Sequence, residues 1–221
     1  MTRKATSSNI VSSTVNNNRL GVDQEMILGG INFIYEVLDK IDLALLDSGS
    51  ERLTCLVELA NLSAIVGNLF RKGFAQASNG RFIPNSPHTY PDLLATTEGS
   101  DDMEIKVSLE NNKPKGHLIK PGPHTTIRYV LGGPNGEYQS GKHNRGDVVW
   151  IWEVRLGRLS PEHFNFSNTE SDSGKTAVIN ADGMNALNLA YCNLRFCPHS
   201  PSGRVYKRLT QEIAASPKLS G

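Results

Sequence analysis

Apolar residues first become regularly spaced after Asp23, where they recur at intervals of three and four positions. This spacing predicts a helix, and the carboxylate of Asp23 is placed to cap its first turn. Ser48 and Ser50 interrupt the pattern, and a second helix is predicted over residues 51 to 77. The apolar positions of the first helix are Met26, Ile27, Ile31, Ile34, Val37, Leu38 and Ile41. The second helix has a polar stripe of Thr54, Glu58, Asn61, Asn68 and Lys72.

The pattern then changes to the alternation that is typical of strands. Residues 90 to 95 form an apolar run, residues 99 to 102 a polar turn, and residues 103 to 109 alternate, which together predict a β-hairpin. Two more strands are predicted over residues 124 to 131 and 147 to 156, and a basic amphipathic helix over residues 204 to 215. The order of elements predicts an α/β fold, with a central mixed β-sheet flanked by helices.

The first 22 residues differ in composition from the rest of the chain. They contain no acid, they are rich in Ser, Thr and Asn, and they carry Arg3, Lys4 and Arg19. Such a composition is poor in the apolar residues that build a core. We therefore expect a flexible N-terminal arm over residues 1 to 22 and a single domain over residues 23 to 221.

The predicted hairpin brings candidate chemistry together. Alternation places Glu104 and Lys106 on one face and Ile105 on the other, and Asp92 on the neighbouring strand can turn its carboxylate toward the same point. Two carboxylates suit a hard divalent ion such as Mg²⁺, and an adjacent ammonium can position a water or stabilise phosphoryl charge. A phosphodiester is the natural target of this group. The alternative is a hairpin whose outer face carries solvated charges.

These residues resemble the PD-(D/E)XK nuclease motif, whose small free-standing members are commonly type II restriction endonucleases. The matching features are Pro91-Asp92, a step of twelve residues to Glu104, and Lys106 two positions later. The chain has no other Pro-Asp dipeptide and no other acid followed two residues later by Lys. Glu153-Val154-Arg155 partly repeats the acid-x-Lys half of this motif, but no Pro-Asp precedes it at a suitable distance.

The resemblance implies a restriction-endonuclease-like core and a Mg²⁺-dependent, site-specific deoxyribonuclease acting on double-stranded DNA, commonly as a homodimer. It implies that Asp92 and Glu104 hold the metal and that Lys106 acts on the attacking water or the transition-state charge. Strand alternation adds the backbone carbonyl of Ile105 as a metal ligand, and Glu58 is the best-placed acid on a preceding helix. A repair or junction-resolving nuclease of the same fold, or a non-catalytic DNA-binding module, remains an alternative.

Positive charge is concentrated between residues 111 and 145, where Glu137 is the single acid. Lys and Arg gain from contact with DNA phosphates, and loops on a rigid sheet often carry such contacts. A solvated face is the alternative reading. The DNA-binding candidates are Lys113, Lys115, His117, Lys120, His124, Arg128, Lys142 and Arg145, together with Arg81 in the loop before residue 90.

Composition narrows the class of protein. The chain has 221 residues, 38% of them hydrophobic, and a formal net charge of +1, so any nucleic-acid surface must be local. Three cysteines and no apolar run of about 20 residues predict a cytoplasmic protein without a membrane span. The sequence lacks a G-x-S-x-G elbow, a Walker loop and an H-E-x-x-H motif, which argues against serine hydrolases, P-loop enzymes and zinc peptidases.

Overall fold

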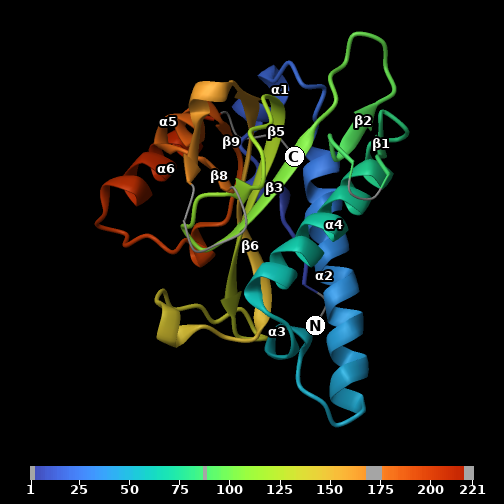
Figure 1. Cartoon of the computed structure of the whole chain (residues 1–221). Helices are drawn as coiled ribbons and strands as arrows, with labels where there is room; N and C mark the ends of the chain where they lie inside the picture. The colour runs from blue at the N-terminus through green and yellow to red at the C-terminus, as the bar shows by residue number, and fades with distance from the viewer. Residues whose placement is uncertain (1–2, 87–88, 168–175, 217–221) are drawn as a thin grey trace.

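A mixed central sheet forms the middle layer of the structure, a computed structural model that describes residues 3–86, 89–167 and 176–216. Its strands are β3 (Glu104–Leu109), β5 (Gly122–Gly132), β6 (Val148–Leu159) and β9 (Asn188–Cys192), in the order β3-β5-β6-β9. β3 runs parallel to β5, whereas the other neighbours are antiparallel (Figure 1). The prediction of an α/β fold with a mixed sheet between helices is confirmed.

Two helices, α2 (Gln24–Asp47) and α4 (Leu59–Ala77), pack against each other and cover one face of the sheet (Figure 1). Asp23 caps α2 as expected, because its Oδ1 accepts a hydrogen bond of 3.0 Å from the Met26 N–H. The apolar face that defines α2 in the sequence is buried against α4 and the sheet.

The second predicted helix is divided in two. A short helix α3 (Leu53–Leu56) is followed by Val57 and Glu58 in extended conformation, and α4 begins only at Leu59. Asp42 of α2 accepts a hydrogen bond of 3.0 Å from the Leu53 N–H, which ties α3 to α2. The extended residues then let α4 take its own direction across the sheet.

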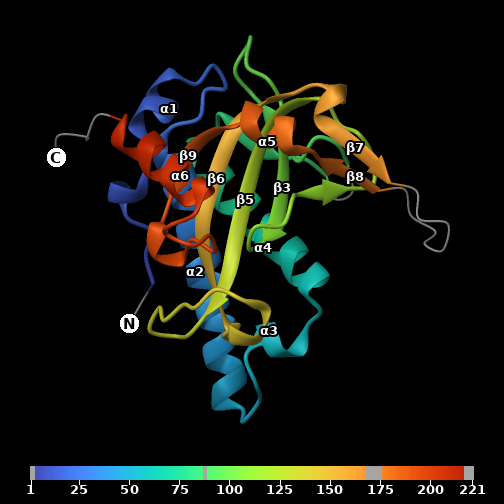
Figure 2. The same ribbon diagram turned by 90° about the vertical axis from the view of Figure 1, so that its left-hand side faces the viewer.

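The opposite face carries α5 (Ala181–Ala186), α6 (Arg204–Ala214) and a small antiparallel sheet (Figure 2). The strands of the small sheet are β4 (Lys115–Gly116), β8 (Thr176–Ile179) and β7 (Phe164–Ser167), in the order β4-β8-β7. We call these three strands the wing. Short 3₁₀ turns cover Ser7–Asn9, Lys142–Asn144, Pro161–His163 and Leu194–Phe196.

The predicted hairpin is largely wrong. β2 (Leu93–Ala95) pairs antiparallel with β1 (Phe82–Pro84), not with β3. Only Leu93 bridges toward β3, through two backbone hydrogen bonds of 3.0 and 2.9 Å with Met103. The local pattern located β3, but β2 covers only the last three residues of the predicted run, so that Asp92 lies just before the strand. It did not reveal the partner of β3, which joins β5 across an intervening loop.

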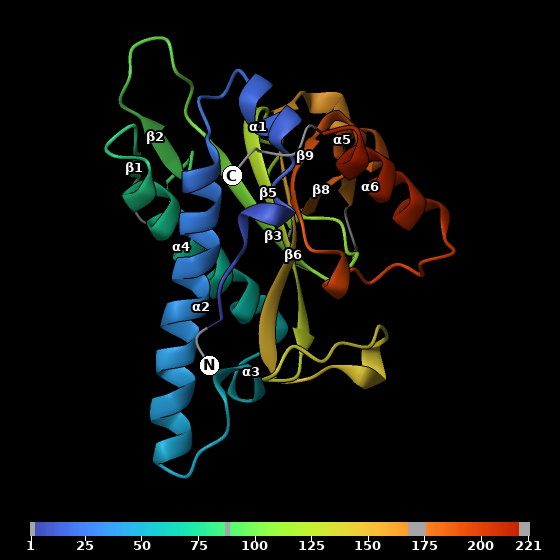
Figure 3. The same ribbon diagram turned by 180° about the vertical axis from the view of Figure 1, so that it is seen from behind.

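Residues 3 to 22 differ from the expected mobile arm. Ile10 forms an antiparallel bridge with Tyr191, the Val11 N–H donates 2.9 Å to the Ala190 carbonyl, and α1 (Ser12–Asn17) lies beside β9 (Figure 3). Apolar side chains scattered among the Ser and Asn residues explain this packing. Those buried are Ala5, Ile10, Val11, Val15, Leu20 and Val22.

Within the described ranges, no helix is both long enough and apolar enough to cross a membrane.

Candidate functional site

The face of the sheet that points away from α4 carries polar side chains on β3 and β5. The parallel register pairs Glu104 with His124 and Lys106 with Thr126, and paired residues share a face. The alternate residues face the helices, as Val107 does next to Gly67 of α4. The sequence therefore builds a strand that is apolar toward α4 and charged on its other side.

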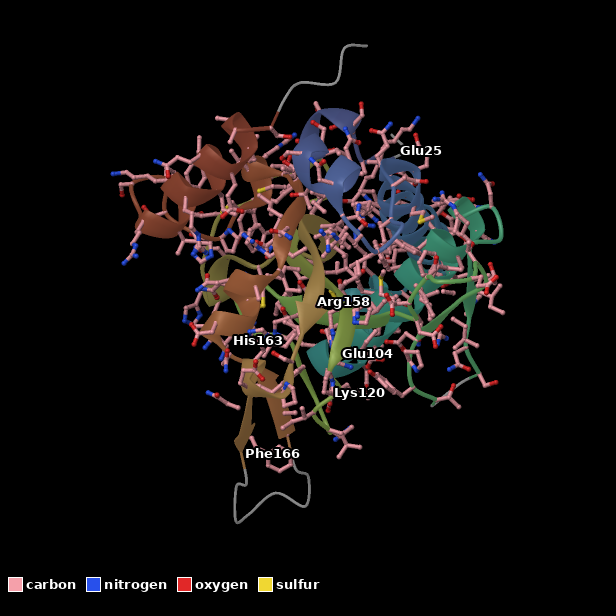
Figure 4. All side chains as sticks on the ribbon, turned by 90° about the horizontal axis from the view of Figure 1, so that it is seen from above. Glu25, Glu104, Lys120, Arg158, His163 and Phe166 are labelled. Atoms are coloured by element: carbon pink, nitrogen blue, oxygen red, sulfur yellow. The ribbon has the colours of Figure 1, made fainter. Side chains whose placement is uncertain are left out.

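Glu104 is the first residue of β3 and lies on this polar face, with a relative exposure of 1%. The ammonium groups of Lys106 and Lys120 both donate to its Oε1, the latter at 2.7 Å, and Figure 4 shows Glu104 and Lys120 side by side. Burial is the strongest single influence and would raise the pKa of Glu104, but the two ammonium groups together lower it. Oε2 of Glu104 is buried and has no hydrogen-bond partner among the described residues.

Asp92 lies against the outer side of β3. Its Oδ2 accepts a hydrogen bond of 2.8 Å from the Ile105 N–H, and its Oδ1 is 3.9 Å from the Arg71 guanidinium. Burial raises the pKa of Asp92, and the negative charge of Glu104 raises it further. The structure thus brings together the three residues of the sequence motif, Asp92, Glu104 and Lys106, and adds Lys120. We call these four residues the acid–lysine cluster.

The hydrogen bond to Asp92 also orients Ile105. In an extended strand the N–H and the C=O of one residue point to the same side. Because the N–H of Ile105 points to Asp92, its carbonyl faces outward from β3 on the same side.

His124 is fully buried, with 0% relative exposure, so its predicted role in contacting DNA does not fit its position. Its Nδ1 lies 3.0 Å from the Gly122 carbonyl, while Nε2 has no hydrogen-bond partner within the described part of the chain. Burial lowers the pKa of His124, and the positive charge of Lys106 lowers it further. The parallel pairing of β3 and β5, which places His124 beside Glu104, was not visible in the sequence.

A magnesium ion fits the donor set of the cluster. Among the residues that the structure describes, no three His, Cys, Asp or Glu side chains are gathered as a metal site. Mg²⁺ does not require such a group, since it commonly uses one or two carboxylates together with waters and substrate phosphate oxygens. Asp92 and the unpartnered Oε2 of Glu104 supply hard oxygen donors of this kind.

Glu58 does not join the cluster. It is exposed and precedes the first turn of α4, whose Leu59 carbonyl accepts a hydrogen bond from Tyr129. Tyr129 pairs with Leu109, at the far end of β3 and five residues from Glu104, or about 16 Å along the strand. From α4, Arg71 instead reaches Asp92, with its guanidinium 3.9 Å from Oδ1.

The predicted DNA-binding residues do not form one surface. Lys113, Lys115, His117 and Lys142 are exposed. Several others form ion pairs with acids of the chain: Arg81 pairs with Asp23, Lys120 with Glu104, and Arg145 with both carboxylate oxygens of Glu110 at 2.7 and 3.1 Å.

Arg128 belongs to a separate buried charge network. Its guanidinium lies 3.2 Å from Glu153, which also accepts a hydrogen bond of 2.8 Å from Arg155. The side chains of all three are nearly inaccessible, with 10%, 2% and 6% exposure. Arg128 is therefore placed to compensate a buried carboxylate, and the predicted contact between Arg128 and DNA does not fit its position. The same geometry gives Glu153 and Arg155 a structural role.

Comparisons of this chain with protein-family models, with curated proteins and with solved structures each gave no match.

Proposed function

We propose that this chain is a Mg²⁺-dependent type II restriction endonuclease that hydrolyses phosphodiester bonds in double-stranded DNA at a specific sequence. The observation that supports the proposal is the meeting of Asp92, Glu104 and Lys106 at one point beside β3. A restriction-endonuclease-like core is part of the same proposal.

Each member of the cluster has a distinct task in this reaction. Asp92, Glu104 and the Ile105 carbonyl would hold Mg²⁺, which supplies Lewis-acid stabilisation of the phosphate. Lys106 would donate hydrogen bonds that orient the attacking water and stabilise the negative charge that develops on the phosphoryl oxygens. The oxygen of that water forms a new bond to phosphorus as the bond from phosphorus to the leaving oxygen breaks. The attacking water gives its proton to bulk water, and bulk water protonates the leaving oxygen.

The two lysines on Glu104 have different surroundings. Lys106 is on the strand itself and its side chain is 14% exposed, whereas Lys120 precedes β5 and is 27% exposed. Lys120 also lies 4.8 Å from the centre of the Tyr90 ring. We assign Lys106 to the water and Lys120 to neutralising Glu104 and meeting a phosphate as DNA arrives.

The exposed Lys113, Lys115, His117 and Lys142 would contact the DNA backbone. Cutting both strands of a palindrome favours a homodimer with two-fold symmetry, and we propose this assembly in the cytoplasm.

Two alternatives lead to different outcomes. A repair or junction-resolving nuclease would use the same cluster on a branched substrate. A non-catalytic DNA-binding module is favoured by one specific observation, the saturation of Glu104 Oε1 by two ammonium groups, which resembles a closed salt bridge.

The test is incubation of a sequenced supercoiled plasmid and a branched duplex with the protein in Mg²⁺, in Ca²⁺ and in EDTA. Glu104→Gln, purified identically, is the control for contaminating nuclease. Discrete fragments that require Mg²⁺ support the restriction enzyme, and cutting confined to the branched duplex supports the repair enzyme. Tight binding without cleavage would leave only the module.

A further inference from the structure

One row of residues crosses the wing. Gly116 of β4 pairs with Ala177 of β8, and Ala177 pairs with Phe166 of β7. Directly paired residues of antiparallel strands direct their side chains to the same face. The Phe166 ring therefore projects from the face to which a side chain at Gly116 would also point.

That face of the wing looks onto the acid–lysine cluster. A Cβ placed on Gly116 would lie 3.3 Å from Cε and 3.4 Å from Nζ of Lys106. Neighbouring strands are about 4.8 Å apart, so Phe166 on the second strand from Gly116 starts about 10 Å from this point.

The inner part of the same face is already packed. Phe164 and Ile179 are paired and buried over the central sheet, and the Phe164 ring lies 5.9 Å from the His124 ring. Phe166, two residues further out, is 45% exposed, and Figure 4 shows it beyond His163 at the outer part of β7. The wing is thus buried at Phe164, whereas the ring of Phe166 is exposed to solvent.

The cations that the Phe166 face looks onto are those of the acid–lysine cluster. The side chains of Lys106 and Lys120 are 14% and 27% exposed there. Exposed Lys115, next to Gly116 in β4, directs its side chain to the opposite face of the wing. Cations beside an aromatic ring that accepts any base are the combination used to bind single-stranded nucleic acid.

We propose that Phe166 stacks on a nucleobase displaced from the helical stack, in the DNA strand whose phosphate reaches the acid–lysine cluster, so that the wing fixes the position of the strand relative to the cut. This inference rests on the proposed function. It adds a base-contacting residue that the sequence motif does not contain.

The first test is binding in Ca²⁺ of a duplex containing the cleavage site, once mapped, or of a plasmid-derived duplex. Phe166→Ala is expected to weaken binding roughly tenfold or more, the range seen when stacking aromatics are replaced, and Phe166→Tyr to retain most of the affinity. Leu43→Ala is the matched control, because Leu43 is 60% exposed on the distant half of α2. Equal affinity of the wild type and Phe166→Ala overturns the proposal.

The second test reads stacking directly and does not require cleavage. Phe166→Trp is titrated with the same duplex, and the fluorescence of the wild type, which contains Trp150 and Trp152, is subtracted. Quenching of the difference signal supports stacking, and a bound complex without quenching overturns it. If no substrate is cut but quenching occurs, the nuclease proposal fails while Phe166 keeps its role in a binding module. If Phe166→Ala changes sedimentation of the free protein and leaves DNA affinity unchanged, the wing is a protein interface instead.

Discussion

The Ile105 N–H donates a hydrogen bond of 2.8 Å to Oδ2 of Asp92. Because β2 pairs with β1, this bond and the Leu93–Met103 bridge are what hold Asp92 against β3. The carboxylate of Asp92 therefore has a structural role, as the acceptor of this hydrogen bond, in addition to its proposed role in metal binding. A test of metal binding has to preserve the hydrogen bond.

The Asp92→Asn variant separates the structural role of Asp92 from its proposed role in metal binding. The amide oxygen still accepts the Ile105 N–H, but the negative charge is lost. We expect an unchanged fold and a fall of at least about 10²-fold in the single-turnover cleavage rate in Mg²⁺. Asp182→Asn, at an exposed position of α5, is the control and should cleave like the wild type. Near-normal cleavage by Asp92→Asn would remove Asp92 from the metal site.

Replacing Lys106 and Lys120 should have non-additive effects on the free energy of unfolding. Lys106→Ala and Lys120→Ala each leave one ammonium on the buried Oε1 of Glu104. The double variant leaves the carboxylate unpaired, and we expect a loss of roughly 3–5 kcal/mol in the free energy of unfolding, more than the sum of the single losses. Urea denaturation measures all three, and adding Glu104→Gln to the double variant should restore stability. Strict additivity would show that the lysines do not share one partner.

Cleavage should distinguish the same two lysines. Lys106→Ala is expected to lower the single-turnover rate by about 10² to 10⁴, the range typical of a positioned acid–base group. Lys120→Ala should mainly weaken DNA binding, because Lys120 is more exposed. An unchanged rate for Lys106→Ala at saturating Mg²⁺ would contradict its assignment to the water.

The buried imidazole of His124 predicts a dependence of stability on pH. Burial lowers the pKa of His124 in the folded protein, so the unfolded chain binds the proton more readily. Stability is then fully present above the unfolded value of about 6.5 and falls as the pH decreases through it. Thermal unfolding from pH 8 to pH 5 measures the slope, which His124→Gln should reduce.

His117→Gln, at an exposed position, serves as the control for that experiment and should leave the slope unchanged. His199, whose pKa is also lowered by burial, should contribute a slope of the same sign. An identical slope in the wild type and His124→Gln would show that His124 is not held neutral by the fold.

Replacing exposed cations should change DNA affinity, whereas replacing a buried cation should change the free energy of unfolding. Replacing Lys113 and Lys115 with Ala should weaken binding to all DNA sequences and reduce the salt slope by about 2, while stability is maintained. Arg128→Met should instead remove a partner of buried Glu153 and lower the free energy of unfolding by roughly 3–5 kcal/mol. Salt titrations and urea denaturation of both variants decide between these effects. If Arg128→Met keeps the stability of the wild type but loses affinity for DNA, Arg128 contacts DNA after all.

Local pattern predicted much of the secondary structure. The start of α2 at its Asp23 cap, the strands β5 and β6, and the helix α6 lie close to their predicted bounds. These elements carry their signal within a short window of sequence, either as apolar periodicity or as a cap.

Pairing and burial of charge were not predictable in this way. The contact of Glu104 with His124 depends on a parallel register between strands separated by a loop, which no local window contains. Arg128 was predicted to contact DNA, and Glu153 was noted only as part of a partial repeat of the motif, yet the two side chains compensate each other inside the protein. The candidate site was recoverable only where the sequence motif itself, Asp92 with Glu104 and Lys106, carried the information.

The bridge between Ile10 and Tyr191 has a consequence for self-association. β9 is the last strand of the central sheet, and a free outer strand offers unpaired N–H and C=O groups to any other chain. The N-terminal segment occupies part of that edge through Ile10 and Val11. Deleting residues through Val11 would uncover the edge, and the shortened protein should aggregate by strand addition at concentrations at which the full chain does not.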